Sequence, residues 1–160
     1  MFKMKLISKG AEATISLSNN EISKERIQKS YRLPVLDKKL RKSRTKSETK
    51  ILNKLKGIIN VPRVIKTDIE KQIVMEYIQG KKLSDHLEKL NWENICKQLA
   101  EIITKLHDQD IIHGDLTTSN MIYKDNRLYL IDFGLGFHSH KIEDKAVDLH
   151  LLKQSLNAKH

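Results

Sequence analysis

The sequence predicts an α+β fold in two small lobes that share a core: a β-rich N-terminal lobe with one long helix and a mainly helical C-terminal lobe. Strand-like runs separated by turn residues occupy much of the first half. One long, basic helical stretch interrupts them, and apolar residues at helical spacing dominate the second half. We therefore predict an N-terminal lobe of residues 1–78 and a C-terminal lobe of residues 79–160.

The composition predicts a folded, cytoplasmic protein with a polyanionic partner. Apolar residues make up 39% of the 160 residues, and the formal net charge of +10 suits RNA, although solubility alone accounts for part of it. The single cysteine, Cys96, allows no internal disulfide, and a reducing cytoplasm is the simplest compartment. No apolar run approaches a membrane span, and residues 1–6 lack the features of a signal peptide.

Three strands are expected at the start of the chain. Residues 6–17 form strand-like runs on either side of a small-residue turn, which predicts a hairpin. Gly10 and Ala11 in that turn would let backbone N–H groups approach phosphate oxygens, although an ordinary hairpin explains them equally well. After an Asn-Asn turn, a third strand is expected over residues 21–24, and it carries Lys24.

A long helix is predicted from Asp37 as its N-cap to Gly57 just past its C-cap, with Pro34 lying before it. Apolar residues recur on one face of this helix, and Glu48 falls among them. Because a buried and unpaired carboxylate is costly, we predict that Lys24 pairs with Glu48. A marginal position with a neighbouring lysine as the partner is the alternative.

The opposite face of this helix is strongly basic. Its cations are Lys38, Lys39, Arg41, Lys42, Arg44 and Lys46. Such a face is either simply solvated or a contact surface for tRNA. A dedicated RNA-binding module is a third interpretation of the charge, but the scattered tyrosines offer few stacking platforms for it.

Extended segments are expected at residues 61–68 and 72–78, and the second ends in a linker. Ser84 is predicted to cap a short helix, and a longer amphipathic helix is predicted after Asn91. His107, near the end of that helix, is interpreted as a charge partner for the helix C-terminus.

Two short stretches, residues 113–120 and 131–134, carry the residues for chemistry. They hold Asp115, Asn120 and Asp132, the last just before Phe-Gly. Phosphoryl transfer from a nucleotide needs such a set: one carboxylate to orient a hydroxyl or water, and an amide with a second carboxylate to hold Mg²⁺. The ordered combination therefore predicts phosphoryl transfer.

A hairpin explains how these residues would meet. Residues 121–130 comprise two apolar runs on either side of the turn-prone Lys124-Asp125-Asn126. Such a hairpin returns Asp132 to the neighbourhood of Asp115 and Asn120.

The last part of the chain is expected to form a helix. A flexible exit at residues 134–136 precedes a helix that starts near Glu143 with acidic residues in its first turn. His138 and His140 suggest metal ligands, but no cysteine lies nearby and their spacing is not helical, so we do not expect zinc.

The order of these parts resembles a minimal two-lobed protein-kinase-like fold. The match becomes close at residues 29–37, 44–48, 113–120 and 143–149. Together these segments resemble the small atypical kinase subunit of the KEOPS (EKC) complex, a relative of the RIO kinases. The resemblance covers nearly the whole chain, and the Thr-Thr-Ser run after Leu116 is specific to that subfamily.

The resemblance implies ATP and Mg²⁺ as cofactors and a role for each matched residue. It implies that Asp115 is the catalytic-loop aspartate, with Asn120 and Asp132 as magnesium ligands. It also implies that Asp148 braces the catalytic loop and that residues 75–78 form the hinge that contacts adenine. The ATP-binding residues that it implies are Ile7, Ser8, Lys9, Gly10, Ala11, Glu12, Ala13, Lys24, Glu48, Met75, Glu76 and Ile78.

The chain departs from the usual kinase pattern in three places. One glycine remains in the phosphate loop, His-Gly-Asp replaces His-Arg-Asp, and no Ala-Pro-Glu segment follows. These departures argue against switching by activation-loop phosphorylation and against a broad protein kinase. Members of the subfamily also carry a basic C-terminal tail, so we expect the C-terminal lobe to be truncated or part of a longer polypeptide.

The resemblance implies ATP-dependent phosphoryl transfer, as an atypical Ser/Thr kinase, an ATPase or both, in support of threonylcarbamoyladenosine formation on tRNA. The implied partners are the other KEOPS subunits, including the tRNA threonylcarbamoyl-transfer enzyme. Two alternatives remain open: a small-molecule phosphotransferase, since aminoglycoside-type kinases share His-Gly-Asp, and a nucleotide-binding scaffold without useful turnover.

Overall fold

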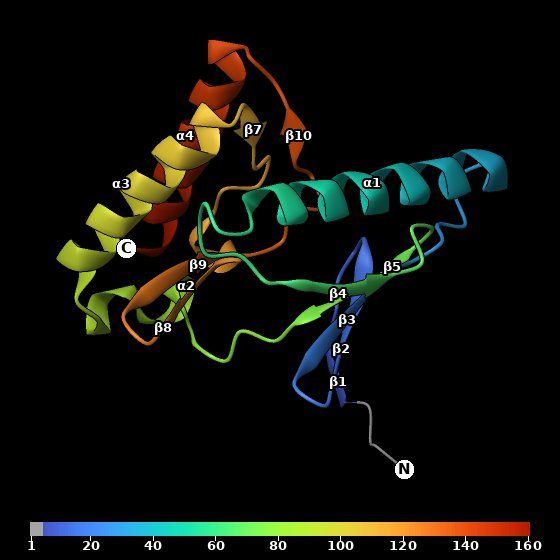
Figure 1. Ribbon diagram of the computed structural model, residues 1–160, viewed down its shortest axis with the longest axis horizontal. Helices are drawn as coiled ribbons and strands as arrows, with labels where there is room; N and C mark the ends of the chain where they lie inside the picture. Colours follow the sequence, from blue (N-terminus) through green and yellow to red (C-terminus); the bar gives the residue numbers. More distant parts are fainter. Residues whose placement is uncertain (1–4) are drawn as a thin grey trace.

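The computed structural model describes residues 5–160. Figure 1 shows a sheet with one long helix beside it, followed by a second and mainly helical part. The sheet has five antiparallel strands in the order β1-β2-β3-β5-β4. Its strands are β1 (Lys5–Lys9), β2 (Ala13–Ser18), β3 (Glu21–Arg26), β4 (Val64–Thr67) and β5 (Gln72–Glu76). The predicted hairpin and third strand are confirmed, and β3 continues past the predicted end to Arg26.

Tight turns join the first three strands. Asn19 and Asn20 have φ angles of 52° and 63°, the left-handed pair that a two-residue hairpin turn requires. Asparagine enters this region more readily than most residues, so the local sequence and the strand twist agree. At the other end of β2, the Gly10 N–H donates to the carbonyl of Ala13 at 3.0 Å, which closes the candidate phosphate loop into a compact turn.

Helix α1 (Pro34–Leu55) has Leu33 as its N-cap, four residues before the predicted Asp37, so Pro34 lies inside the helix and not before it as predicted. Pro34 is its first residue, where a fixed φ and a missing N–H are tolerated. The prediction of Asp37 as the N-cap is wrong, because its side chain is fully buried and accepts hydrogen bonds from the Lys29 N–H at 3.2 Å and Arg41 Nε at 2.7 Å. Asp37 therefore ties the preceding loop to the first turns of the helix.

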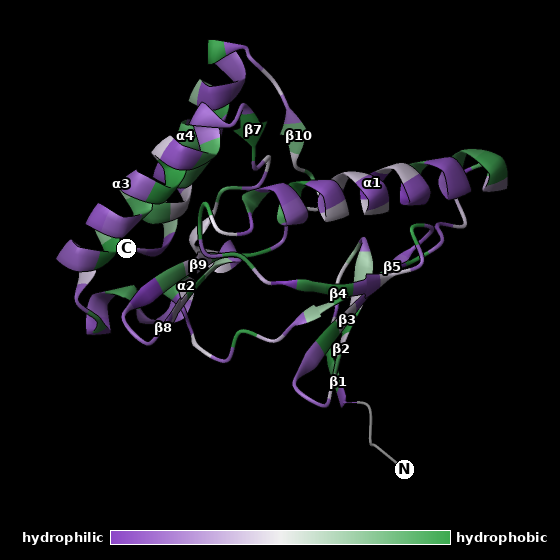
Figure 2. Ribbon diagram, viewed as in Figure 1, coloured by the Kyte–Doolittle hydropathy of each residue, from purple (hydrophilic) through white to green (hydrophobic). Residues whose placement is uncertain are grey.

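The far end of α1 follows the prediction. Gly57 takes a φ of 83° directly after the C-cap Lys56, as expected for a glycine that stops a helix. Most of the helix is hydrophilic (Figure 2), and its buried apolar residues Ile51, Leu52 and Leu55 gather near its C-terminus. That end of α1 enters the core.

The second part combines three helices with short strands. Its helices are α2 (Leu83–His86), α3 (Trp92–Asp108) and α4 (Ile142–Lys159), with 3₁₀ turns η1 (Leu87–Lys89) and η2 (Thr118–Asn120). Its strands are β6 (Lys81–Lys82), β7 (Ile111–Ile112), β8 (Met121–Lys124), β9 (Arg127–Leu130) and β10 (Phe137–His138). The strands form a β6-β8-β9 sheet and a β10-β7 pair. Within residues 5–160, no helix is both long enough and apolar enough to cross a membrane.

The helix predicted after Asn91 is confirmed, whereas the predicted Ser84 cap is wrong. Asn91 caps α3, because its Oδ1 accepts a hydrogen bond from the Asn94 N–H at 3.1 Å. Ser84 does not cap the short helix: it lies inside α2, and its hydroxyl donates to Asp85 at 3.0 Å. Helix α2 follows β6 without a break, so the path of the strand fixes its first residue.

The predicted hairpin after the catalytic-loop candidate is confirmed. Asp125 and Asn126 have φ angles of 49° and 60° and join β8 to β9 in a two-residue turn. The hairpin brings the chain back on itself, so the Ile131 N–H donates to the carbonyl of Asn120 at 3.0 Å. Asp132 therefore follows directly beside the end of η2.

One apolar core runs through both parts of the molecule. It contains Leu55 of α1, Met75 of β5, Leu106 of α3, Leu128 of β9 and Leu152 of α4. The two parts therefore share their buried surface, as expected for a chain of this size. The lobe boundary after residue 78 falls in the connection between β5 and β6 and stays a proposal.

Candidate active site

A cleft of about 390 Å³ opens between the N-terminal sheet and the segments around η2 and residues 131–135. The predicted site residues that line it are Ser8, Gly10, Ala11, Glu12, Ala13, Lys24, Asp115, Asn120 and Asp132. The other lining residues, which were not predicted as individual site residues, are Ile15, Arg26, Arg44, Lys82, Ser119, Ile131, Gly134 and Leu135. Segments from distant parts of the chain thus share one concave site.

The predicted ion pair between Lys24 and Glu48 is confirmed. Lys24 Nζ of β3 lies 2.8 Å from Glu48 Oε1 of α1, and both side chains are buried. The same ammonium donates to Asp132 Oδ1 at 2.6 Å, across 108 positions of sequence. Lys24 therefore connects the sheet, the helix and the predicted metal ligand.

The charges around Lys24 keep each other ionised. Burial lowers the pKa of Lys24, but the carboxylates of Glu48 and Asp132 outweigh burial and hold that pKa above its ordinary value of 10.5. Burial raises the pKa of Asp132, but the Lys24 ammonium outweighs it and holds that pKa below its ordinary value of 3.8. Near neutral pH, the cleft therefore contains a charged ion pair.

The catalytic-loop candidate is organised by Asn120. Its amide Nδ2 donates to the backbone carbonyl of Asp115 at 2.9 Å and to Asp115 Oδ2 at 2.8 Å. These bonds fix the Asp115 carboxylate at the end of η2. Within residues 5–160, Asn120 Oδ1 receives no hydrogen bond, which leaves it available as a metal ligand.

Asp132 occupies a strained backbone conformation at the cleft. Its φ of 62° lies in the left-handed region, which is unfavourable for residues other than glycine. The Gly134 N–H donates to Asp132 Oδ1 at 3.1 Å, and the side chain stays 43% exposed. The position of this partly exposed carboxylate in the cleft, beside Lys24, is what favours a functional role for Asp132.

The donor set at the cleft fits Mg²⁺. Asn120 and Asp132 supply a carbonyl and a carboxylate oxygen, the hard ligands that this cation prefers. Within the described part of the chain, no group of three or more His, Cys, Asp or Glu side chains forms a metal cage. Magnesium held by one or two protein oxygens and by nucleotide phosphates needs no such cage.

Asp148 of α4 braces the catalytic loop, as the resemblance implied. Its Oδ2 accepts hydrogen bonds from the His113 N–H at 2.8 Å and from His107 Nε2 at 3.1 Å, and its Oδ1 accepts from the Gly114 N–H at 2.9 Å. These hydrogen bonds outweigh the effect of burial and hold the pKa of Asp148 below its ordinary value. His107 therefore pairs with a buried carboxylate, whereas the sequence suggested a role at the helix C-terminus.

His113 is buried and neutral, and its tautomer follows from its neighbours. Its Nε2 lies 3.1 Å from the carbonyl of Ile131, which needs a donor, and its Nδ1 accepts from the Asp115 N–H at 3.3 Å. The proton therefore sits on Nε2. Burial lowers the pKa of His113 below 6.5, against the opposing charges of Asp148, Asp132 and Asp115.

This lowered pKa predicts a loss of stability in mild acid. The unfolded chain binds a proton at His113 near pH 6.5, whereas the folded chain binds it only at lower pH. The free energy of unfolding should therefore decrease as the pH falls below about 6.5. Urea titrations between pH 8 and 5 would measure this, with His113→Asn as the comparison. An identical pH dependence for both proteins would contradict the assignment.

Some predicted ATP-binding residues lie outside the lining of the cleft. Met75 and Ile78 of the predicted hinge are buried, and the Glu76 side chain lines a different cavity. Ile7 and Lys9 of β1 also do not line the cleft. The ATP-binding roles of these five residues stay predictions.

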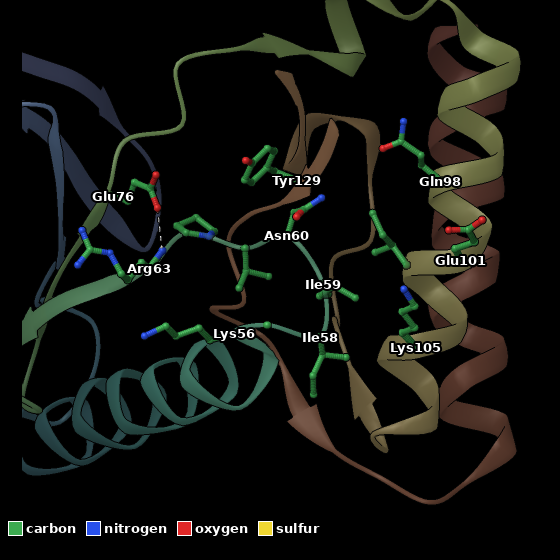
Figure 3. A pocket seen from close by; sticks show the side chains of 14 residues that line it. Lys56, Ile58, Ile59, Asn60, Arg63, Glu76, Gln98, Glu101, Lys105 and Tyr129 are labelled. Carbon is green, nitrogen blue, oxygen red and sulfur yellow. Dashed lines mark hydrogen bonds between the residues drawn. The ribbon is translucent and has the colours of Figure 1, made fainter. Parts of the chain in front are cut away.

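That second cavity, of about 410 Å³, lies between the α1–β4 connection and α3. Figure 3 shows Glu76 and Arg63 on its sheet side, with the Arg63 N–H bonded to Glu76 Oε2 at 3.5 Å, and Gln98, Glu101 and Lys105 on α3. Acidic and basic side chains are interspersed around it. The lining of this cavity therefore does not favour either an anionic or a cationic ligand.

Comparison with known proteins decides the family. The model described as "RIO domain" matches residues 4–145. The KEOPS complex subunit Bud32 of Pyrococcus abyssi is 46% identical over 172 aligned residues, covering 98% of this chain and 78% of that protein. The chain belongs to the Bud32 family of RIO-domain proteins.

Other Bud32-family relatives differ in length. The EKC/KEOPS complex subunit BUD32 of Enterocytozoon bieneusi is 42% identical and covers 98% of this chain and 84% of its own. A probable bifunctional tRNA threonylcarbamoyladenosine biosynthesis protein of Methanococcus vannielii is 48% identical over 97% of this chain. This chain matches only 29% of that longer protein.

Solved structures confirm the protein-kinase-like fold of this Bud32-family chain. The Rio2 kinase of Chaetomium thermophilum, solved as an ADP/Mg²⁺-phosphoaspartate complex, aligns with a TM-score of 0.73 at 14% identity, over 98% of this chain and 55% of that one. The streptomycin-ATP-APH(2")-IIa complex aligns with a TM-score of 0.67 at 17% identity, over 91% of this chain and 69% of that one. At these identities the similarity concerns the fold.

The His-Gly-Asp motif of this Bud32-family chain has a steric reason. Gly114 has a φ of 78°, and a Cβ at this position would lie 2.4 Å from the carbonyl oxygen of Leu135. Any larger residue would therefore push the catalytic loop away from residues 134–136.

We expect Gly114→Ala to lower the free energy of unfolding by roughly 2–4 kcal/mol, because strain and a backbone clash combine. Gly57→Ala is the matched control: its φ is 83°, but nothing lies within 4 Å of its Cβ, so about 1 kcal/mol is expected. Chemical denaturation of both variants measures the difference. Equal losses would show that the contact with Leu135 does not matter.

The basic face of α1 is only partly free. Arg41 pairs with Asp37, Lys42 with Glu70, and Arg44 with Glu12. Lys38, Lys39 and Lys46 are exposed. A contact with tRNA would therefore rest first on these three lysines, and it stays a proposal.

Proposed function

We propose that this chain transfers the γ-phosphoryl group of ATP to water, to a protein hydroxyl, or to both. One observation carries the proposal: Lys24, Asp115, Asn120 and Asp132 all line one cleft, together with the Gly10 turn. This is the set of groups that phosphoryl transfer requires. Membership of the RIO-domain family supports the same reading.

Each residue of the cleft has a distinct role in this proposal. Lys24 binds the phosphates as a cation, and its ion pair with Glu48 fixes the position of its ammonium group. Asn120 and Asp132 hold Mg²⁺, which when bound neutralises charge on the phosphate oxygens. Asp115 accepts the proton of the attacking hydroxyl or water, and the hydrogen bond from Asn120 orients the Asp115 carboxylate for this step.

We further propose that this chain acts within a KEOPS complex and supports formation of threonylcarbamoyladenosine on tRNA. Relatives that are 42% to 48% identical carry these names as complex subunits or as a bifunctional biosynthesis protein. The proposed partners are the other KEOPS subunits, including the enzyme that transfers the threonylcarbamoyl group, and tRNA at the exposed lysines of α1.

The acceptor of the phosphoryl group is tested by following one labelled substrate. Purified chain receives γ-labelled ATP and Mg²⁺, alone and then with tRNA and KEOPS partners. Released phosphate and labelled protein are measured in the same samples. We expect Mg²⁺-dependent phosphate release to exceed protein labelling, because the sequence has no Ala-Pro-Glu segment to bind a peptide substrate. We also expect this release to increase in the complex.

The other outcomes separate the remaining candidates. Label that accumulates on serine or threonine in place of free phosphate would indicate a protein kinase. Nucleotide binding without turnover in any mixture would indicate a scaffold. Phosphorylation of an aminoglycoside added to the free chain would favour the small-molecule phosphotransferase, whose fold this chain shares. No nucleotide binding at all would overturn the proposal.

A further inference from the structure

Arg26 is a buried arginine at the nucleotide cleft whose role the sequence did not indicate. It lies on β3 two residues after Lys24 and therefore on the same face of the strand. It is only 5% exposed, yet it is among the residues that line the cleft. Burying a guanidinium is costly unless a carboxylate pairs with it, so the partner of Arg26 indicates what Arg26 does.

The partner of Arg26 is Glu48, which thereby binds two cations. Arg26 Nη2 lies 2.6 Å from Glu48 Oε2, while Lys24 Nζ lies 2.8 Å from Glu48 Oε1. Each carboxylate oxygen therefore has its own cation. Of the two cations, Lys24 alone also contacts the partly exposed Asp132, so two cations balance two carboxylates in this group.

The guanidinium is not fully satisfied by Glu48. Arg26 Nε is buried and has no hydrogen-bond partner among the described residues, which is costly for a polar group away from water. The cleft side of this region is tight, since a Cβ on Gly134 would lie 3.5 Å from Arg26 Nη2 and 3.2 Å from Lys24 Nζ.

We propose that Arg26 is a positioning residue that holds Glu48 while Lys24 moves from Asp132 to the nucleotide phosphates. The inference rests on the function proposed above. Of the two Asp132 carboxylate oxygens, Lys24 bonds only to Oδ1, so Asp132 Oδ2 remains available for the metal, and Lys24 is shared between Glu48 and the phosphates once the nucleotide binds. Arg26 keeps the charge of Glu48 balanced during this exchange, so Glu48 does not hold Lys24 back.

Removing the guanidinium should therefore impair turnover through Glu48. In Arg26→Gln, Lys24 is the only cation left on a buried carboxylate and stays bound to it and to Asp132. We expect kcat/KM for MgATP to fall at least tenfold. Arg26→Lys keeps a charge near Glu48 and should recover part of the loss, although it lacks the planar guanidinium.

A double-mutant cycle separates this role from a direct contact with phosphate. Arg26→Gln, Glu48→Gln and the double variant are assayed for MgATP turnover and MgADP binding, well below the unfolding temperature of each protein. If Arg26 acts through Glu48, the double variant is no worse than Glu48→Gln alone. Arg127→Gln, at an exposed position of β9, is the matched control.

The remaining outcomes are each decisive. Losses that multiply in the double variant would overturn the proposal, because Arg26 would then act independently of Glu48. Normal kcat/KM in folded Arg26→Gln with a lowered unfolding temperature would reduce Arg26 to a structural role. If Arg26→Gln does not fold, Arg26→Lys with and without Glu48→Gln provides the same cycle. A wild-type chain that fails to bind MgADP would overturn the proposed function instead.

Discussion

Asp132→Asn should reduce Mg²⁺-dependent ATP turnover by roughly a hundredfold or more while leaving the chain folded. The substitution removes the carboxylate charge that would hold the metal, and metal-ion catalysis contributes several kcal/mol to such reactions. Lys24 keeps its second partner, because it also contacts Glu48 at 2.8 Å. The side chain is 43% exposed, so its replacement leaves no large cavity.

Phosphate release as a function of Mg²⁺ concentration measures this effect. Circular dichroism establishes that the variant is folded under the assay conditions. Asp125→Asn is the matched control, because Asp125 lies in the β8–β9 turn and outside the cleft. Turnover that is unchanged in Asp132→Asn would remove Asp132 from the metal site and with it the assignment of the cleft.

Asp148→Ala should lower the free energy of unfolding by roughly 3–5 kcal/mol, because three buried donors would lose their acceptor at about 1–3 kcal/mol each. The N–H groups of His113 and Gly114 and the ring of His107 all bond to this one carboxylate. Within residues 5–160 it is the only recorded side-chain acceptor for these three groups. The catalytic loop should therefore loosen, and turnover of the folded fraction should also fall.

Urea denaturation near neutral pH measures the change in stability. Glu143→Ala removes an exposed carboxylate from the first turn of the same helix and should cost less than about 1 kcal/mol. Asp148→Asn keeps one acceptor oxygen and should lie between the two. If Asp148→Ala and Glu143→Ala have the same effect, α4 does not brace the loop through Asp148.

The opposite charges of Lys24 and Asp132 also explain why the cleft is preorganised. In the function proposed above, the ammonium of Lys24 and the carboxylate of Asp132 lie together at the cleft before nucleotide and metal bind. Each holds the other in its charged form, as the directions of their pKa shifts require. Ligand binding then replaces one ion pair by two separate interactions.

The sequence by itself determined the elements whose causes are local. The Asp125-Asn126 turn, the start of a helix after Asn91 and the stop at Gly57 each follow from the local preferences of one or two residues. The ordered Asp, Asn and Asp of the cleft were also readable, because the hairpin between them is local. The Lys24–Glu48 pair was predictable because a carboxylate on an apolar helix face needs a cation.

The predictions for Asp37, Ser84 and His107 were wrong because each residue type suits a local role at a helix end, whereas the surrounding structure gives it another environment. Asp37 and Ser84 are residue types that often cap helices. Asp37 is instead buried and bonded to the Lys29 N–H and Arg41. Ser84 lies inside α2, which follows β6 directly. His107 lies near a helix end, but α4 brings Asp148 against it. Residue type does not distinguish these cases.

Only the tertiary structure decided how the charges at the cleft are shared. The Lys24–Asp132 bond joins residues 108 positions apart, and Arg26 meets Glu48 only because β3 lies against α1. Electrostatic pairing depends on distance and burial, and neither quantity is written in a local pattern. The motifs in the sequence therefore predict the type of chemistry. The packing of the sheet, α1 and the β8–β9 hairpin determines which cation pairs with which carboxylate.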